Sequence, residues 1–346
     1  MKRCIQLASL GSGFVSPNPM VGAVLVHERR IIGEGYHQYY GEGHAEVQCL
    51  NSVLPEDQSL IQHSTLYVSL EPCAHFGKTP PCADLIIRHR IPKVVVGCRD
   101  PFPDVNGKGL ERMRDAGIEV ITGVEEEACK SLNRAFFLKH TQNRPFILLK
   151  WAQSADGLIA LPNNQPVPIS HPQTNRLTHR WRSDSDAILV GTRTVASDNP
   201  SLTNRNWYGR NPLRMLVDLN AVLSPALSVF SDGHRTVLFG QAHSELNVSD
   251  NLEVVPVSQK AQVIPALIQY CQDHRLQSVM IEGGRQLLQS FVDAGCWDEA
   301  RIISSTGVYL KHGVPAPELT NATLFKTYEL ATDRIMYFRP CKPEFI

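Results

Sequence analysis

Four residues in the first quarter of the chain carry side chains that bind metal ions or move protons: His44, Glu46, Cys73 and Cys82. One histidine and two cysteines give three ligands for zinc, and catalytic zinc sites keep a fourth position open for water, whereas structural sites are usually closed by four protein ligands. Glu46 follows His44 by two residues, so its carboxylate can lie over that water without binding the metal. The residue types and their order therefore predict a hydrolytic zinc site rather than a buried histidine and two ordinary core thiols.

The order His-x-Glu, then Pro-Cys and a further Cys, is the pattern of zinc deaminases, in which an activated water attacks an amino-bearing ring carbon and the glutamate transfers protons. Here eight residues separate Cys73 from Cys82, where the common pattern has two. We expect one helix from near His44 to about Leu54 and another from Cys82 to Arg88. A cysteine at a helix N-terminus has its thiolate favoured, and the thiolate is the form that zinc binds.

The composition is that of an ordinary globular protein and excludes several functions. The chain has 346 residues, 42% of them hydrophobic and 20% charged, with a formal net charge of zero. This length favours two domains, and the neutral charge gives no electrostatic footprint for nucleic acid or an acidic membrane. Nine cysteines are too sparse for a disulfide scaffold, and no stretch reaches the length of a membrane span. We therefore expect a cytoplasmic protein that binds neither nucleic acid nor membrane.

Strands alternate with helices along the whole chain, which predicts sheets with helices on both faces. We expect a β-hairpin turning at Arg29-Arg30, one long helix over residues 125–139, and a C-terminal hairpin around Ala331-Thr332. The polar, proline-ended segment 141–145 reads as a linker. The predicted domains are therefore residues 1–142 and residues 145–346.

Two strand–glycine–helix transitions in the second half are typical of phosphate binding, although glycines also simply end strands: Glu282-Gly283-Gly284-Arg285 and Gly191–Val195. Together they suggest one dinucleotide spanning the sheet edge. The fingerprint Gly-x-Gly-x-x-Gly is absent, which disfavours an ordinary dehydrogenase fold. For Lys150, Arg182 and Arg205 the alternatives are a phosphate site and a solvated surface, and for Asp198 a proton donor and a turn residue. Spacing alone leaves these alternatives open.

The chain resembles the bifunctional deaminase–reductase family of riboflavin biosynthesis over essentially its whole length. The motifs that carry the resemblance are Pro17-Asn18-Pro19-x-Val21-Gly22, Gly35-Tyr36-His37, His44-Ala45-Glu46-Val47, Leu70-Glu71-Pro72-Cys73-x-His75-x-Gly77-Lys78-Thr79-Pro80-Pro81-Cys82, Leu149-Lys150-x-Ala152-x-Ser154-x-Asp156-Gly157, Gly191-x-x-Thr194-Val195-x-x-Asp198-x-Pro200-x-Leu202-Thr203-x-Arg205 and Glu282-Gly283-Gly284. The resemblance implies an α/β protein with an N-terminal cytidine-deaminase-like three-layer α/β/α domain and a C-terminal dihydrofolate-reductase-like α/β domain.

The resemblance implies two consecutive reactions on a phosphoribosyl-pyrimidine: zinc-dependent hydrolytic deamination of 2,5-diamino-6-ribosylamino-4(3H)-pyrimidinone 5′-phosphate, then NADPH-dependent reduction of its ribosyl group to ribityl. It also implies a homodimer or larger homo-oligomer. The implied residues are the Zn²⁺ ligands His44, Cys73 and Cys82, the proton shuttle Glu46, deaminase-pocket residues Asn18, His75, Lys78 and Asp100, the NADPH-binding residues Ala152, Thr194, Asp198, Gly283 and Gly284, reductase-substrate residues Arg182, Leu202, Arg205 and Glu282, and Lys150 and Asp198 as candidates for polar catalysis.

Two departures from the family pattern bear on function. Phe102 replaces an asparagine of the usual Asp-Pro-Asn-Pro segment, and Pro166 and Pro168 replace the serine and tryptophan of a reductase loop. A slower, retuned or lost reductase is therefore an alternative, leaving a monofunctional zinc deaminase with a binding domain. A nucleic-acid deaminase is disfavoured by the neutral charge. A non-catalytic zinc protein is disfavoured by Glu46, since a structural site has no use for a proton shuttle.

Overall fold

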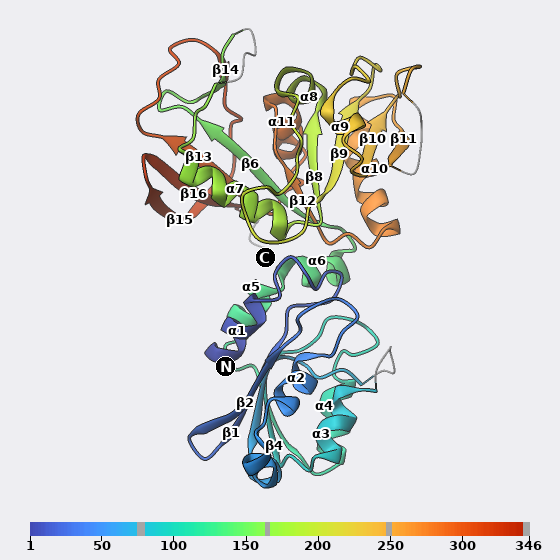
Figure 1. The fold of residues 1–346 in the computed structure, drawn as a ribbon, viewed down its shortest axis with the longest axis vertical. Coiled ribbons are helices and arrows are strands. Elements are labelled where there is room, and N and C mark those ends of the chain that lie inside the picture. The colour runs from blue at the N-terminus through green and yellow to red at the C-terminus, as the bar shows by residue number, and fades with distance from the viewer. Residues whose placement is uncertain (75–79, 163–166, 247–250, 342–346) are drawn as a thin grey trace. The chain divides into compact units, whose positions relative to one another are not determined.

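The computed structural model describes residues 1–74, 80–162, 167–246 and 251–341. The chain forms two compact units, Met1–Asn143 and Arg144–Ile346, and each is built on one main β-sheet with helices packed against it (Figure 1). Both units are mixed α/β, as the alternation of strands and helices predicts.

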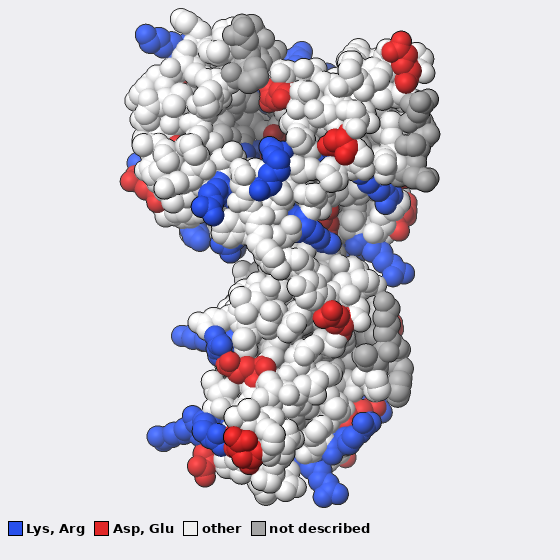
Figure 2. Space-filling model, in the orientation of Figure 1, with Lys and Arg blue, Asp and Glu red and all other residues white. Residues whose placement is uncertain are grey.

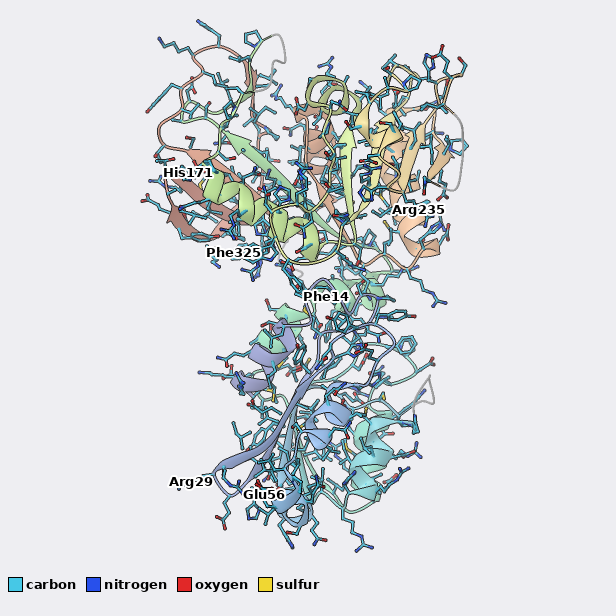
Figure 3. All side chains as sticks on the ribbon, viewed as in Figure 1. Phe14, Arg29, Glu56, His171, Arg235 and Phe325 are labelled. Carbon is cyan, nitrogen blue, oxygen red and sulfur yellow. The ribbon has the colours of Figure 1, made fainter. Side chains whose placement is uncertain are left out.

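The N-terminal unit contains a five-stranded sheet in the order β2-β1-β3-β4-β5. Its strands are β1 (Gly22–His27), β2 (Arg30–Tyr36), β3 (Thr65–Leu70), β4 (Lys93–Cys98) and β5 (Glu119–Thr122). Strand β1 runs antiparallel to β2 and β3, while β3, β4 and β5 are parallel. The predicted β1–β2 hairpin forms, and Arg29 projects from its tip (Figure 3).

The helices of this unit are α1 (Lys2–Ser9), α2 (Ala45–Asn51), the 3-10 helix η1 (Pro55–His63), α3 (Cys82–Arg88), α4 (Lys108–Asp115), α5 (Glu126–Leu132) and α6 (Arg134–Gln142). The single helix predicted over residues 125–139 is wrong, because the chain breaks at Asn133. The buried Asn133 side chain accepts a hydrogen bond from the backbone N–H of Met20 and donates one to its carbonyl, both at 2.8 Å. This tertiary pairing outweighs the local tendency to continue the helix.

The C-terminal unit contains a nine-stranded sheet in the order β11-β10-β9-β8-β12-β6-β13-β16-β15. Its strands are β6 (Phe146–Gln153), β8 (Ala187–Gly191), β9 (Leu213–Asp218), β10 (Thr236–Gly240), β11 (Leu252–Pro256), β12 (Ser278–Ile281), β13 (Glu299–Ser305), β15 (Ala322–Leu330) and β16 (Asp333–Pro340). The first seven in that order are parallel. The predicted hairpin β15–β16 extends the sheet at one end, where β16 runs antiparallel to both β13 and β15.

The helices of the C-terminal unit are α7 (Pro172–Asp184), α8 (Thr192–Asp198), α9 (Ser228–Ser231), α10 (Lys260–Asp273) and α11 (Arg285–Asp293), and β7 (Leu158–Ala160) pairs with β14 (Val314–Pro315) in a small separate sheet. Strands β8, β12 and β6 are adjacent, so their carboxyl ends share one edge of the sheet. Ligands of open parallel sheets bind at such an edge.

Charged side chains are spread over both units. On the face drawn in Figure 2, positive and negative groups are scattered without a continuous basic patch. Within the residues that the structure describes, no helix combines the length and apolar character that a membrane crossing requires.

Candidate active sites

The structure brings His44, Cys73 and Cys82 together, with their donor atoms all within 4.8 Å of one another. His44 Nδ1 lies 3.6 Å from Cys73 Sγ and 3.3 Å from Cys82 Sγ. Zinc bonds of about 2.3 Å to sulfur and 2.05 Å to nitrogen, at a tetrahedral angle, require an N···S separation of about 3.6 Å. The three atoms therefore fit a single zinc ion. Among the described residues, no fourth acidic, histidine or cysteine side chain joins this group.

Two helix starts and one strand end position these ligands. His44 is the N-cap residue of α2, Cys82 is the first residue of α3, and Cys73 lies three residues beyond the end of β3. The backbone N–H of Cys82 donates to Cys73 Sγ at 3.3 Å. Hydrogen bonds from the Cys82 thiol, the His44 ring and the Cys82 amide lower the pKa of the Cys73 thiol to about 4, so they favour its thiolate form, whereas Cys73 and burial raise the pKa of the Cys82 thiol.

Glu46 lies in the first turn of α2 and only 3% of it is exposed. Burial raises the pKa of its carboxyl above the ordinary value for glutamate, an effect that His44 partly opposes. A carboxyl group with a raised pKa accepts and returns protons near neutral pH, as a proton shuttle must.

A second buried carboxylate, Glu71, holds the loop that leads to Cys73. Its oxygens accept hydrogen bonds from the backbone N–H groups of Gly107 at 2.8 Å, Gly109 at 3.1 Å and Asp100 at 3.2 Å. These bonds tie the β3–Cys73 loop to the loop before α4. Glu71 lies in a quoted motif, but sequence spacing gave no indication of this structural role.

Replacing Glu71 by alanine is expected to lower the free energy of unfolding of the N-terminal unit by roughly 2–4 kcal/mol, because three buried backbone donors lose their acceptor. Urea unfolding followed by circular dichroism measures the change. Glu111→Ala, which truncates an exposed glutamate of α4, is the control and is expected to stay within about 0.5 kcal/mol of the parent protein. Equal stability of the two variants would contradict the role given to Glu71.

Of the four predicted deaminase-pocket residues, the structure describes two. Asn18 Nδ2 lies 3.0 Å from His37 Nε2, and the His37 ring packs edge-on against His44 with centroids 5.5 Å apart. One side chain, His37, therefore lies between Asn18 and the metal ligand His44. His37, which also lies 3.2 Å from the carbonyl oxygen of Gly43 through Nδ1, was not predicted as a site residue. Its signal in the sequence was the motif Gly35-Tyr36-His37. His75 and Lys78 lie outside the described residues.

Asp100 is 6% exposed, and burial raises the pKa of its carboxyl to about 7. Its Oδ1 accepts a hydrogen bond from the backbone N–H of Phe102 at 2.8 Å. The Phe102 ring packs against the ring of His140 on α6, with centroids 5.0 Å apart. The aromatic substitution therefore adds packing in this segment, while the contact to Asp100 comes from the backbone and does not need an asparagine.

In the C-terminal unit, Arg182 and Glu282 form a bidentate ion pair. Nε of Arg182 donates to Oε1 of Glu282 at 3.0 Å, and Nη2 donates to Oε2 at 2.6 Å. Lys150 is close to both. Leu149 of β6 pairs with Ile281 of β12. Lys150 and Glu282 are the residues that directly follow this pair, so they lie next to each other. Burial lowers the pKa of the Lys150 ammonium, an effect that Arg182 increases and Glu282 opposes. Burial alone would raise the pKa of Glu282, but Arg182 and Lys150 lower it. The cluster thus holds two cations and one carboxylate.

Arg205 belongs to the same neighbourhood. Its Nη1 donates to Thr203 Oγ1 at 3.1 Å, and Nη1 of Arg182 donates to the Thr203 carbonyl at 3.2 Å. Leu202, 2% exposed, anchors this segment. Arg205 also lines a hollow of about 750 Å³, together with Arg176, Asn206, Trp207 and Tyr208. The predicted substrate residues of this unit are therefore linked by hydrogen bonds, ion pairs and chain continuity.

The two predicted phosphate-binding transitions also meet. The backbone N–H of Gly191 donates to the carbonyl of Gly283 at 3.2 Å. A Cβ at Gly284 would lie 3.2 Å from Thr194 Oγ1, and Gly283 has a φ of +135°, which favours glycine. Glycines at both positions therefore leave room beside the Thr194 hydroxyl.

The remaining predictions have less support in the geometry. Ala152 lies near the carboxyl end of β6, opposite Ile303 of β13. Asp198 is exposed at the last position of α8, where the Ser197 hydroxyl donates to it at 2.7 Å. Pro168 is exposed, and Pro166 lies outside the described residues. The geometry thus favours Lys150 over Asp198 as the group for polar catalysis.

Comparison with known proteins gives a consistent result for both units. Residues 1–98 match the family described as the cytidine and deoxycytidylate deaminase zinc-binding region, and residues 145–308 match the RibD C-terminal domain. The chain is 38% identical to riboflavin biosynthesis protein RibD of Aquifex aeolicus over 301 residues, which cover 86% of this chain and 83% of that protein. It is 36% identical to RibD of Bacillus amyloliquefaciens over 334 residues, 94% of this chain and 88% of that protein.

Solved structures agree over nearly the whole chain. A crystal structure from Thermotoga maritima, described as a diaminohydroxyphosphoribosylaminopyrimidine deaminase/5-amino-6-(5-phosphoribosylamino)uracil reductase, is 36% identical, with a TM-score of 0.89 over 99% of this chain and 97% of that one. RibD of Acinetobacter baumannii is 29% identical, with a TM-score of 0.87 over 98% and 97% of the two chains. The predicted fold class, a deaminase-like domain followed by a reductase-like domain, is confirmed.

Proposed function

Because this chain belongs to the riboflavin biosynthesis protein RibD family and is a bifunctional zinc-dependent deaminase and NADPH-dependent reductase, we propose that its two reactions are carried by two separate sets of residues. The first reaction is deamination of a diaminopyrimidine ribosyl 5′-phosphate at C2. The second is reduction of the resulting phosphoribosylaminouracil to its ribityl form. The deaminase domain is residues 1–142 and the reductase domain is residues 145–346.

The observation that carries the deaminase is the donor triangle of His44, Cys73 and Cys82 beside the buried Glu46. Zinc, when bound, supplies Lewis-acid activation of a water molecule. Glu46 accepts the proton of that water and delivers it to the departing ammonia. Asn18 and Asp100 orient the pyrimidine ring, Asn18 by its amide and Asp100 by its buried carboxyl group. His75 and Lys78 complete the substrate pocket.

The reductase is carried by the Lys150–Arg182–Glu282 cluster. Lys150 lies within β6, Glu282 directly follows β12, and Arg182 comes from α7. NADPH, when bound, supplies a hydride to C1′ of the ribosyl group. Lys150 gives a proton to the ring oxygen as the C1′–O bond breaks, so the open ribityl chain gains one hydride and one proton. Arg182, Leu202, Arg205 and Glu282 hold the substrate, and Ala152, Thr194, Asp198, Gly283 and Gly284 hold NADPH.

The main alternative is a monofunctional deaminase, because prolines occupy the loop positions where serine and tryptophan are usual. The intact charge cluster and the paired glycine turns support an active reductase despite that loop. Neither Pro166 nor Pro168 has a side-chain hydrogen-bonding group, so we expect their effect to fall on the affinity for ligands.

Chelation of zinc separates the two activities. With the diaminopyrimidine substrate, the zinc-free protein is expected to release no ammonia, while with the deaminated intermediate it still oxidises NADPH at the rate of the zinc-loaded protein. The loss of nicotinamide absorbance and an ammonia assay measure the two reactions, and zinc added back serves as the control. No NADPH oxidation above background by either form would establish the monofunctional alternative.

We further propose a cytoplasmic homodimer or larger homo-oligomer. Two features support this. The described cysteines are all free thiols, which suits a reducing compartment. The edge strand β15 exposes Leu324 and Phe325, as Figure 3 shows for Phe325, and natural proteins usually cover long apolar edge strands. Light scattering coupled to gel filtration measures the assembly, and a monomer would contradict the proposal.

A further inference from the structure

His179, which no motif-based prediction singled out, lies on α7 with 2% of its surface exposed. Its Nδ1 accepts a hydrogen bond from the backbone N–H of Arg205 at 3.0 Å. Three residues along α7, Arg182 donates to the carbonyl of Thr203 at 3.2 Å. Two side chains of α7 therefore form hydrogen bonds with backbone groups of the segment that carries Arg205.

This segment does not hold its shape by local preference. Asn199 has a φ of +39° and Leu202 a φ of +55°, and such left-handed backbone costs energy for residues other than glycine. Such conformations persist where surrounding contacts determine them. The contacts that hold this segment include the buried Leu202 side chain and the two hydrogen bonds to α7. Nearer Asn199, Arg214 donates to the Ser201 carbonyl at 3.2 Å and the Ser228 N–H donates to Asn199 Oδ1 at 2.8 Å.

The charges around His179 keep its ring able to accept this bond. Burial lowers the pKa of His179 to about 4, and Arg182, Arg205 and Lys150 add to the effect while Glu282 opposes it. The ring is therefore neutral at physiological pH. Because Nδ1 accepts from the amide, the ring proton is on Nε2. An acceptor at Nδ1 and a donor at Nε2 are distinct features that substitutions can separate.

We propose that His179 is a positioning residue of the reductase: through the backbone amide of Arg205 it fixes the segment that presents the Arg205 guanidinium to the substrate. This inference rests on the proposed role of Arg205 in binding substrate. His179 needs no contact with substrate or NADPH for this function. Its loss therefore weakens substrate binding and leaves hydride transfer and NADPH binding largely intact.

Two variants of similar polarity test which ring atom matters. His179→Asn places an amide oxygen the same number of bonds from the backbone as Nδ1, whereas His179→Gln places its amide group where Nε2 was. In the full-length, zinc-loaded protein with the deaminated intermediate, His179→Gln is expected to raise the substrate KM about tenfold through loss of the hydrogen bond. His179→Asn is expected to stay within about threefold of the parent KM, and kcat and the KM for NADPH stay nearly constant in both. Equal KM values for the two variants would overturn the inference.

A double-mutant cycle tests whether His179 acts through Arg205. Arg205→Ala alone is expected to raise the substrate KM, and adding His179→Gln to it should raise KM no further. Independent, multiplying effects would overturn the inference, as would an unchanged KM in Arg205→Ala. Ammonia release by the deaminase domain of each variant checks that the chain is intact. Failure of the proposed function is separate, since the parent protein would then not oxidise NADPH at all.

Discussion

Glu46→Gln is expected to retain zinc and to lose deamination by roughly 10²–10⁴-fold in kcat, the range that a positioned general acid–base contributes. Glutamine preserves the size of the side chain in the first turn of α2 but neither accepts nor returns a proton. The three metal ligands are unchanged. The substitution therefore removes proton transfer while leaving the donor triangle of His44, Cys73 and Cys82 in place.

The measurements are zinc content by elemental analysis and ammonia release with the diaminopyrimidine substrate. NADPH oxidation with the deaminated intermediate should stay at the parent rate, because the reductase residues lie in the other unit. Glu42→Gln, at an exposed position before the same helix, is the matched control and is expected to deaminate normally. Undiminished deamination by Glu46→Gln would show that another group moves the protons.

The zinc ligands could be predicted from the sequence because two of the three lie at helix starts, which local structure determines. His44 and Cys82 each lie at the start of a helix, and helix starts are marked by nearby glycine, proline and apolar periodicity. The bounds of α3 agree with the prediction for the same reason. The two helix starts lie close together because β1 pairs with β3 and β3 pairs with β4. The spacing of the motifs does not indicate these strand pairings, and only the family resemblance implies them.

Other features depend on contacts between distant segments, and the sequence did not indicate them. Asn133 breaks the predicted long helix because it pairs with Met20, 113 positions away. In the sequence, nothing distinguishes His179 from an ordinary helix residue. Its hydrogen bond becomes apparent only from the packing of the segment carrying Arg205 against α7. Likewise, the two glycine motifs could be located in the sequence, but their meeting depends on β8 and β12 being neighbours. Local patterns predict elements and their ends, whereas adjacency is set by the packing of the whole sheet.

Lys150→Met is expected to lower the reductase kcat by roughly 10²–10³-fold, because methionine fills a similar volume and has no proton to give to the ring oxygen. Asp198, the other candidate, is exposed at the end of α8 and bonded to Ser197. We therefore expect Asp198→Asn to change mainly the KM for NADPH. Stopped-flow or steady-state NADPH oxidation with the deaminated intermediate distinguishes the two. Lys260→Met, at an exposed position in α10, is the control for loss of a lysine.

The pH dependence gives an independent check on Lys150. Burial lowers the pKa of its ammonium below the ordinary 10.5, and the protonated form is the one that donates. Activity should therefore fall as pH rises through that lowered pKa, which places the alkaline limb of kcat/KM below pH 10.5. Lys150→Arg keeps the positive charge throughout the pH range of the assay, because a guanidinium in a protein is effectively always protonated. This variant is expected to bind substrate with nearly the parent KM, to turn over slowly, and to lose the alkaline limb. An unchanged limb in Lys150→Arg would assign it to another group and leave Lys150 a binding role only.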